Sequence, residues 1–571
     1  LAGWSLISIA WTPLNDIAVQ DAERALLYAT VFALGLWSCL LAGRRMLLLP
    51  LAVVAVTGAA IGIVITVTLA AGTDVASIVH FDDATLRFPI GYRNADAAFL
   101  LICLWPIVVL AAEGGLAWPL RALLVGAATM LLDLAVLAQS RGVLPALVVA
   151  LVVFVALSPR RLRAATYLVL AVLPVLPALP ALLDVFQYGR GDPGIVPVFR
   201  DTAKAIALSS VGSIALAAVC IRGVEARLDL GPRRVQLLSR AAAAVVVLVV
   251  AVGGTLFVAR QGGPIEFVDQ RLSEFKQGES PNLSSEGSRF GFNAGTNRGD
   301  LWRVALDQGR EDPFRGGGAG SFQIAYLKDR DSNETPRDPH SVELLMFSEL
   351  GIVGFAIFAA FLLSTVVGGM RSRRLSRPAA ALTAGSFSAG AYWLTHASYD
   401  WFWAYPALTA PVMFLFGAAC APAIFDPAPG RRSRGRWAAV AVLAVGAVAA
   451  IPLFFAQSYA NRAYDESVDN PAAALTDLDR AARLNPFDAE PLLSEGVIAS
   501  RLGDRGRALD AFRDAVDREP ENYAGYYFLA LELERSDPGA ARVAAREALR
   551  LNPLDRRARA LDRRLERRRG P

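Results

Sequence analysis

Apolar runs long enough to cross a lipid bilayer recur along most of this chain. A transmembrane helix needs about 20 consecutive apolar residues, and by that criterion we expect about twelve spans. Hydrophobic residues make up 54% of the 571 residues and charged residues only 19%, with a mean hydropathy of +0.41, which is unusual for a soluble domain. The sequence therefore predicts an all-α, polytopic membrane protein, with expected spans at residues 25–42, 47–71, 95–112, 120–138, 142–157, 164–183, 203–221, 241–259, 342–370, 379–395, 405–424 and 437–456.

Arginine is distributed unevenly over the connections between these spans. Alternate connections hold 19 basic residues, and the short intervening ones hold five. Basic residues favour the cytoplasmic side of a membrane. We therefore predict that the large loop 260–341 and the C-terminal segment lie on the opposite, non-cytoplasmic side.

The four cysteines give no sign of a disulfide framework or a metal site. Each lies inside an apolar run, at Cys39, Cys103, Cys220 and Cys420, where a small buried side chain is the ordinary interpretation. No cluster of carboxylates has metal-ligand spacing, so we predict no metal and no cofactor. Residues 1–9 look like the end of an apolar span, which leaves open whether the native N-terminus lies upstream.

An arginine with almost no loop around it lies in Gln139-Ser140-Arg141-Gly142, between two apolar runs. This places Arg141 at the outer membrane boundary, where an unpaired cation is costly. We expect an anionic partner for it. The alternative is that Arg141 extends to a lipid phosphate.

The loop 260–341 contains nine Arg and two Lys against thirteen acidic residues, so any anion must bind to particular arginines. Arg298 and Arg303 flank Trp302 at helical spacing, and a guanidinium can grip a diphosphate bidentately. The glycines between 316 and 320 either form a phosphate-binding nest or simply allow tight turns. No lysine of a nucleotide loop and no flanking strand accompany them, which argues against ATP or NAD.

Histidine occurs only at His80, His340 and His396, all expected at the outer side or its boundary. A group that titrates near neutrality can transfer protons there. His340 has a structural alternative as a polar residue at a helix start. His396 and Asp400 have the spacing of a pair on one helix face, although the aromatic residues around them also fit a membrane-interface belt.

These motifs together resemble the O-antigen ligase and polymerase superfamily over roughly residues 1–456. The similar features are Ser140-Arg141-Gly142, the Arg298-to-Trp302 spacing, the glycine-rich segment, Pro339-His340-Ser341, and Glu349-Leu350-Gly351-Ile352-Val353-Gly354. A weaker one is the series Arg87, Gly91 and Asn94 before a span.

The resemblance implies an enzyme of the cytoplasmic (inner) membrane that transfers a glycan from polyprenyl (undecaprenyl) diphosphate to an acceptor hydroxyl on the outer face. It implies His340 as the catalytic residue and Arg141 and Arg298 as diphosphate ligands. Arg303, from its place beside Trp302, is a third expected diphosphate ligand. Further possible substrate contacts are Arg93, His396 and Asp400. Membrane lipid is an expected partner and nucleic acid is not.

After residue 456 the composition changes to Ala, Arg, Asp and Leu. Leu484-Asn485-Pro486, Arg518-Glu519-Pro520 and Leu551-Asn552-Pro553 recur 34 and then 33 residues apart, a period typical of tetratricopeptide-like helical hairpins. We expect residues 457–571 to form a separate, non-cytoplasmic repeat domain that binds a protein partner. Its basic end, 556–569, either contacts lipid headgroups or is a solvated charged helix.

Two other functions remain open from the sequence. A polysaccharide polymerase would use the same donor with a second lipid-linked glycan as acceptor. A glycan transporter or flippase with a partner-binding tail is the non-enzymatic alternative, and it is disfavoured because the ionisable residues gather at the outer face and not at the membrane midplane. The expected acceptor is a lipid, a glycan or a protein.

Overall fold

The computed structural model describes residues 1–42, 46–71, 81–82, 85–140, 142–188, 194–225, 298–424 and 435–567, with isolated positions between 227 and 259. Apart from one short antiparallel pair, β1 (Phe81–Asp82) and β2 (Thr85–Leu86), the described elements are helical. Before the repeats they are α1 (Ala2–Ile7), η1 (Ser8–Ala10), α2 (Asn15–Ala42), α3 (Leu49–Ala71), α5 (Arg93–Ala112), α6 (Trp118–Leu137), α7 (Val143–Leu157), α8 (Arg161–Val172), α9 (Val175–Asp184), η3 (Val185–Gln187), α10 (Ile195–Val219), the π-helix η4 (Cys220–Glu225), α13 (Arg298–Glu311), α14 (Ser321–Asp329), α15 (Val342–Ser372), α16 (Arg377–Ala397), η5 (Phe402–Ala404), α17 (Pro406–Ile424) and α18 (Gly435–Glu466).

Within the described residues, seven helices are long and apolar enough to cross a membrane. This confirms an α-helical, multi-pass architecture, while the expected number of about twelve spans stays a prediction. The expected span 164–183 begins in α8 and continues in α9, and α2, α16 and α18 coincide with three further expected spans. The expected span 241–259 lies outside the described residues except at isolated positions.

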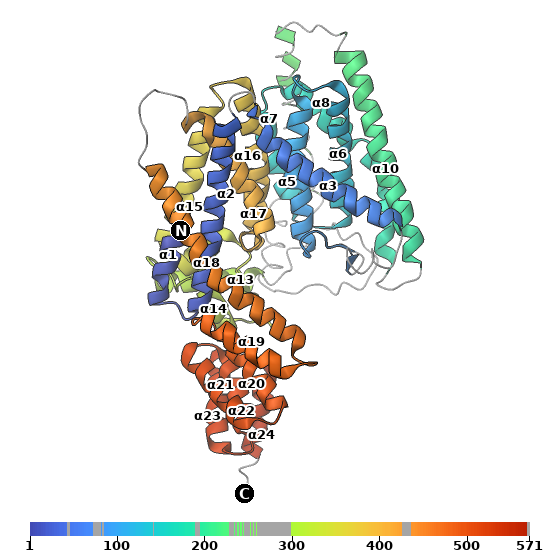
Figure 1. Cartoon of the computed structure of the whole chain (residues 1–571). Helices are drawn as coiled ribbons and strands as arrows, with labels where there is room; N and C mark the ends of the chain where they lie inside the picture. Colours follow the sequence, from blue (N-terminus) through green and yellow to red (C-terminus); the bar gives the residue numbers. More distant parts are fainter. Residues whose placement is uncertain are drawn as a thin grey trace.

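The long helices before the repeats form two neighbouring groups (Figure 1). One contains α2, α15, α16 and α17, and the other contains α3, α5, α6, α8 and α10. Helix α5 is buried along its whole apolar window, as expected for a helix that is hydrophobic on every side. Helix α16 packs on both α5 and α7 and so links the two groups.

Glycines allow α2 and α17 to pack closely. A Cβ at Gly35 would lie 2.0 Å from the Phe414 carbonyl oxygen, and one at Gly417 would lie 1.9 Å from that of Phe32. Small residues at such contacts bring two helix backbones together in a membrane.

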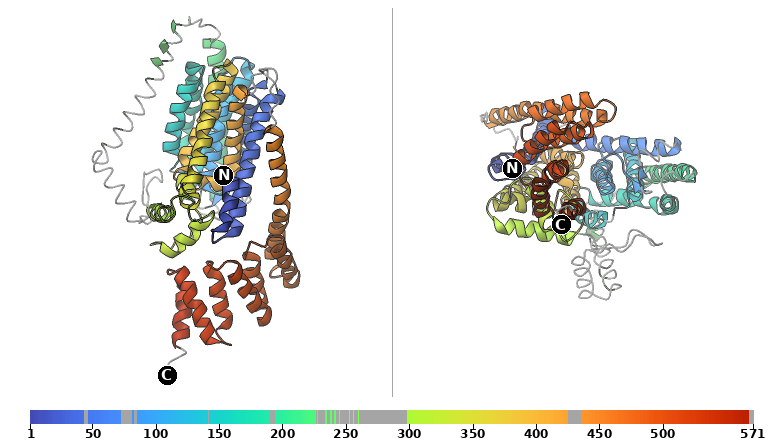
Figure 2. Two further views of the ribbon diagram at one scale, coloured as in Figure 1. Left: turned by 90° about the vertical axis from the view of Figure 1, so that its left-hand side faces the viewer. Right: turned by 90° about the horizontal axis from the view of Figure 1, so that it is seen from below.

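Helices α13 and α14 and the C-terminal helices lie at one end of the long helices (Figures 1 and 2).

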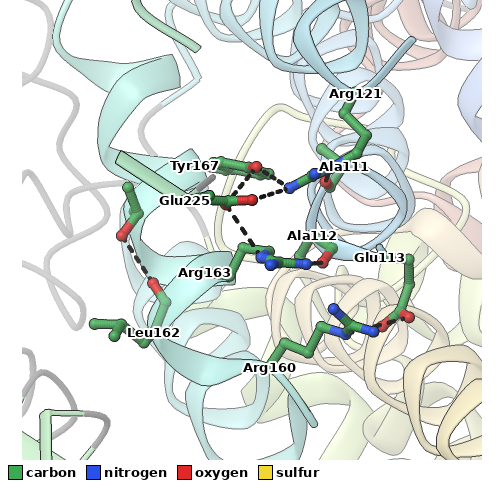
Figure 3. A network of polar contacts seen from close by, with 10 residues as sticks. Ala111, Ala112, Glu113, Arg121, Arg160, Leu162, Arg163, Tyr167 and Glu225 are labelled. Atoms are coloured by element: carbon green, nitrogen blue, oxygen red, sulfur yellow. Dashed lines mark hydrogen bonds and ion pairs between the residues drawn. The ribbon is translucent and has the colours of Figure 1, made fainter. Parts of the chain in front are cut away.

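An arginine-rich network lies on α6, α8 and η4 (Figure 3). Arg121 Nη2 donates to Glu225 Oε2 at 2.8 Å, and Tyr167 Oη donates to Glu225 Oε1 at 2.6 Å. Arg163 Nε lies 3.1 Å from the same carboxylate, so Glu225 ties the end of α10 to α6 and α8.

The C-terminal segment folds into three successive helix pairs. First helices begin at residues 471, 505 and 538, which reproduces the period read from the sequence. Phe512 is buried and stacks on Phe528 at 5.6 Å. On the basic last helix, Arg564 pairs with Glu534 at 2.8 Å, which supports the charged-helix alternative. The six helices are α19 (Pro471–Leu484), α20 (Glu490–Arg501), α21 (Arg505–Arg518), α22 (Tyr523–Leu533), α23 (Pro538–Leu551) and α24 (Arg556–Arg567).

Helix α18 passes through the expected domain boundary at residue 456. It is one helix from Gly435 to Glu466 and packs on α19. The repeat helices therefore follow directly on the helix that contains the last expected span. A further contact joins the two parts, because Arg330 Nη2 donates to Asn552 Oδ1 at 2.8 Å.

Candidate functional site

His340 lies immediately before α15, in a backbone conformation that side chains rarely adopt. Its φ is 54°, and the next residue, Ser341, caps α15 by accepting a hydrogen bond from the Leu344 N–H. The Asp338 carbonyl oxygen lies 3.2 Å from His340 Nδ1. Because a carbonyl can only accept, Nδ1 carries the proton in the neutral ring, and Nε2 keeps its lone pair.

Asp400 is the centre of the polar contacts near this histidine. It is only 1% exposed and accepts hydrogen bonds from Asn94 Nδ2 at 2.7 Å, from the Trp401 N–H at 2.9 Å, and from Tyr92 Oη at 3.2 Å. The Trp401 ring lies 5.6 Å from the His340 ring. Segments far apart in the sequence therefore meet between His340 and Asp400.

Arg298 adds a positive charge to this group. It is the first residue of α13, and its Nη2 lies 4.0 Å from Asp400 Oδ2. Packing positions α13, because Leu301, Val304 and Ala305 are buried in a cluster with Phe322 and Tyr326 of α14. The Arg298 side chain remains 27% exposed, so part of its guanidinium can reach an anion.

The electrostatics favour a neutral His340 near pH 7. Burial lowers the pKa of His340 below its usual value of 6.5, and Asp400 only partly opposes this shift. Burial also raises the pKa of Tyr92, an effect that the charge of Asp400 increases. Tyr92 therefore remains a hydrogen-bond donor to Asp400, and His340 can accept a proton.

His396 is close to the segment that contains Arg141. It is fully buried, and its Nδ1 lies 3.2 Å from Tyr392 Oη. A Cβ at Gly142 would lie 2.4 Å from His396 Nε2, and the Gly142 carbonyl accepts a hydrogen bond from Tyr399 Oη at 2.6 Å. Arg141 itself, like His80 and residues 260–297, lies outside the described residues, so its role stays a prediction.

The expected pairing of His396 with Asp400 is not formed. Helix α16 ends at Ala397, so the helical spacing that would bring the two side chains together does not continue to Asp400. His396 turns to Tyr392 instead, and Asp400 to Tyr92 and Asn94.

Arg303 has a different set of contacts from Arg298. Its Nη2 donates to Asp300 Oδ1 at 2.6 Å and to the Asp329 carbonyl at 2.7 Å, and lies 3.2 Å from Asp331 Oδ2. These bonds tie α13 to the end of α14, which argues against Arg303 as a diphosphate ligand. Arg93, which was expected as a further substrate contact, is the first residue of α5 and is half-buried.

The glycine-rich segment docks into a break in α15. Gly351 has a φ of 63° inside that helix, which leaves backbone groups on either side without their helical partners. The N–H groups of Gly317 and Gly318 donate to the Ser348 and Glu349 carbonyls at 3.0 and 2.8 Å. Because these amides are already bonded, the contacts favour close packing over a phosphate nest.

Sequence reasoning missed several members of this group. Tyr92 carried no signal of its own, and Asn94 stood only in a weak motif. Glu343 was also missed: it accepts hydrogen bonds from Ser398 Oγ at 2.7 Å and from Ser341 Oγ at 3.1 Å. It therefore links the start of α15 to the end of α16.

Comparison with known families shows a similarity over the middle of the chain. A family model described as O-antigen ligase matches residues 198–359, a range that includes Arg298, Arg303, His340 and Gly351. A search of curated proteins found no match. This part of the chain is therefore similar to the O-antigen ligase family.

Proposed function

We propose that this protein transfers a glycan from a polyprenyl diphosphate carrier to an acceptor hydroxyl at the outer face of the cytoplasmic membrane. The observation that carries the proposal is that Arg298 and His340, both within the O-antigen ligase match, converge with Asp400 at one end of the membrane helices. An anion ligand and a proton acceptor are the two groups that such a transfer needs.

His340 acts on the acceptor in the proposed mechanism. Its Nδ1–H bond to the Asp338 carbonyl leaves Nε2 available to take the proton of the acceptor hydroxyl. The hydroxyl oxygen then bonds to the anomeric carbon of the donor. The bond from that carbon to the diphosphate oxygen breaks, and polyprenyl diphosphate leaves with the electron pair.

Arg298 stabilises the diphosphate as its negative charge increases. A guanidinium can donate two parallel hydrogen bonds to phosphate oxygens. Asp400, held by Tyr92 and Asn94, positions Arg298 from the protein side. We assign Arg141 a second contact to the diphosphate, based on the family resemblance and on its neighbour Gly142 beside His396.

The repeat helices have a different role in this proposal. Their 33- to 34-residue period supports a tetratricopeptide-like domain, which we assign to binding a protein partner or presenting the acceptor. The same donor chemistry would serve a polysaccharide polymerase, for which the acceptor is a second lipid-linked glycan.

Transfer by the purified protein tests the proposal. Protein in detergent or lipid discs is mixed with a polyprenyl diphosphate glycan and candidate acceptors, and the products are separated by size. Addition of one donor glycan to an acceptor supports the ligase, and a ladder of donor glycans supports the polymerase. Movement of the donor across vesicles without a new glycosidic bond would identify a transporter and overturn the proposal.

A further inference from the structure

Three carboxylates from distant parts of the chain meet where the repeat helices approach α2. Asp16 lies in the first turn of α2, Asp488 precedes α20, and Glu519 follows α21. One oxygen from each lies within 4.8 Å of the others. Their separation in sequence, from 16 to 488 to 519, explains why spacing alone predicted no metal site.

The spacing of these oxygens suits a single cation. Ca²⁺ binds oxygen ligands at about 2.3–2.6 Å, so two oxygens on one ion can lie up to roughly 5 Å apart. A cavity of about 270 Å³ adjoins the group, and the amide side chains of Gln20 and Gln323 line it. Amide oxygens and water can complete the six to eight ligands that Ca²⁺ takes.

Asp16 is a buried carboxylate with one oxygen that has no hydrogen-bond partner among the described residues. The residue is only 7% exposed, and the unpartnered oxygen is Oδ1. Its other oxygen lies 3.5 Å from Gln20 Nε2. Removing a carboxylate from water without compensation is costly, and a cation bound to the unpartnered oxygen would offset that cost.

The surrounding charges leave an excess of negative charge. Glu490 also acts on Asp488 and Glu519. Arg337 and Arg518 supply positive charge to this group. Four carboxylates against two guanidinium groups leave two negative charges when all are ionised, which is the charge that a divalent cation balances.

We propose that Asp16, Asp488 and Glu519 bind a hard divalent cation, with Ca²⁺ as the ion of best fit. The cation would tie α2 to two of the repeat hairpins, because Asp16 belongs to the membrane part and the other two carboxylates to the repeats. This inference is independent of the glycan-transfer reaction.

Ion binding to the full-length protein tests the site. Chelator-treated protein in detergent is titrated with Ca²⁺ by calorimetry. It is also titrated with Tb³⁺ by luminescence, with Tyr523 on the cavity wall as the sensitiser. We expect one site per chain. Asp16→Asn and Glu519→Gln should each weaken Ca²⁺ affinity about tenfold or more. Changing a residue that only hydrogen-bonds to a metal ligand already costs about that much.

Asp510→Asn is the matched control, because Asp510 lies on a repeat helix with its side chain 77% exposed. It should bind Ca²⁺ as the unaltered chain does. Ca²⁺ should also raise the melting temperature of the unaltered chain and of Asp510→Asn, but not of Asp16→Asn. Absence of Ca²⁺ and Mg²⁺ binding, or binding that survives in both Asp16→Asn and Glu519→Gln, would overturn the proposal. Tighter binding of Mg²⁺ than of Ca²⁺ would overturn the assignment of the ion.

Discussion

His340 combines an unusual backbone with a reactive side chain. Its left-handed φ of 54° costs roughly 1–2 kcal/mol for a residue with a Cβ, and such conformations persist where the surroundings impose them. Glycine adopts this conformation without that cost. Glycine at position 340 therefore separates the role of the backbone from that of the imidazole.

We expect His340→Gly to fold and enter the membrane normally but to lose glycan transfer by about 10²- to 10⁴-fold, the usual contribution of a general base. His340→Ala should lose as much activity and melt at a lower temperature than His340→Gly, because alanine has a Cβ and glycine does not. Transfer rates and melting curves in detergent measure the two effects. Normal transfer by His340→Gly would show that the residue only starts a helix.

The pH dependence follows from the same side chain. Burial lowers the pKa of His340 from 6.5, and only the neutral ring accepts a proton. The value of kcat/KM should therefore be constant near neutrality and should fall only as pH drops through that lowered pKa, below 6.5. An acidic limb centred above pH 7, or one that remains in His340→Gly, would contradict this assignment.

Arg298 and Arg303 provide a matched comparison on one helix. Lysine keeps the charge but loses the two-pronged contact with phosphate oxygens. Because Arg298 lies at Asp400 while Arg303 is bonded to Asp300 and the Asp329 carbonyl, Arg298→Lys should raise KM for the donor several-fold. Arg303→Lys should leave it nearly unchanged. Steady-state kinetics with varied donor would show a reversed order if Arg303 holds the diphosphate.

The sequence predicted some residues of the candidate site and not others. It selected His340 and Arg298 through local motifs, and the structure brings both to Asp400. It could not place Tyr92, because nothing in the sequence shows that residues 92 and 400 meet. It also failed for His396 with Asp400, where helical spacing extends only as far as the helix.

Among the elements, α15 depends on its break at Gly351. A Cβ there would lie 2.3 Å from the Phe314 carbonyl oxygen, and φ is 63°. Gly351→Ala should therefore displace the glycine-rich segment, lower the melting temperature by several degrees and reduce transfer. These effects correspond to a loss of about 1–3 kcal/mol.

Gly212→Ala on α10 is the control for this substitution, since nothing lies within 4 Å of a Cβ there. It should melt at or slightly above the temperature of the unaltered protein, because alanine favours a helix. Equal melting of both variants would mean that the break in α15 tolerates a side chain.

Hydropathy predicted the positions of the seven long apolar helices, because a bilayer requires continuous apolar runs. It did not reveal the break in α15, since Gly351 lies among apolar residues that also fit an unbroken span. The break is set by the segment that docks on it. The sequence around Gly351 alone does not show that residues 316–318 pack against it.

At the scale of the whole molecule, orientation in the membrane is the prediction to test. Single cysteines at Asn333, at Val543 (72% exposed) and at Leu375 (50% exposed), in a Cys220→Ala background, report on the two ends. The first two should react with an impermeant maleimide in intact cells, and Leu375→Cys only after the membrane is opened, because arginines favour the cytoplasm. The opposite labelling pattern would reverse the orientation.

The continuity of α18 sets the angular position of the repeat helices. Each residue of an α-helix adds about 100° of rotation and 1.5 Å of rise. One alanine inserted near residue 460 of this unbroken helix would therefore swing every following hairpin by more than a quarter turn. Arg330 would then no longer face Asn552. Four inserted residues would restore most of the rotation. The rotation set by α18, more than its length, therefore decides which surface of the repeats meets α13 and α14.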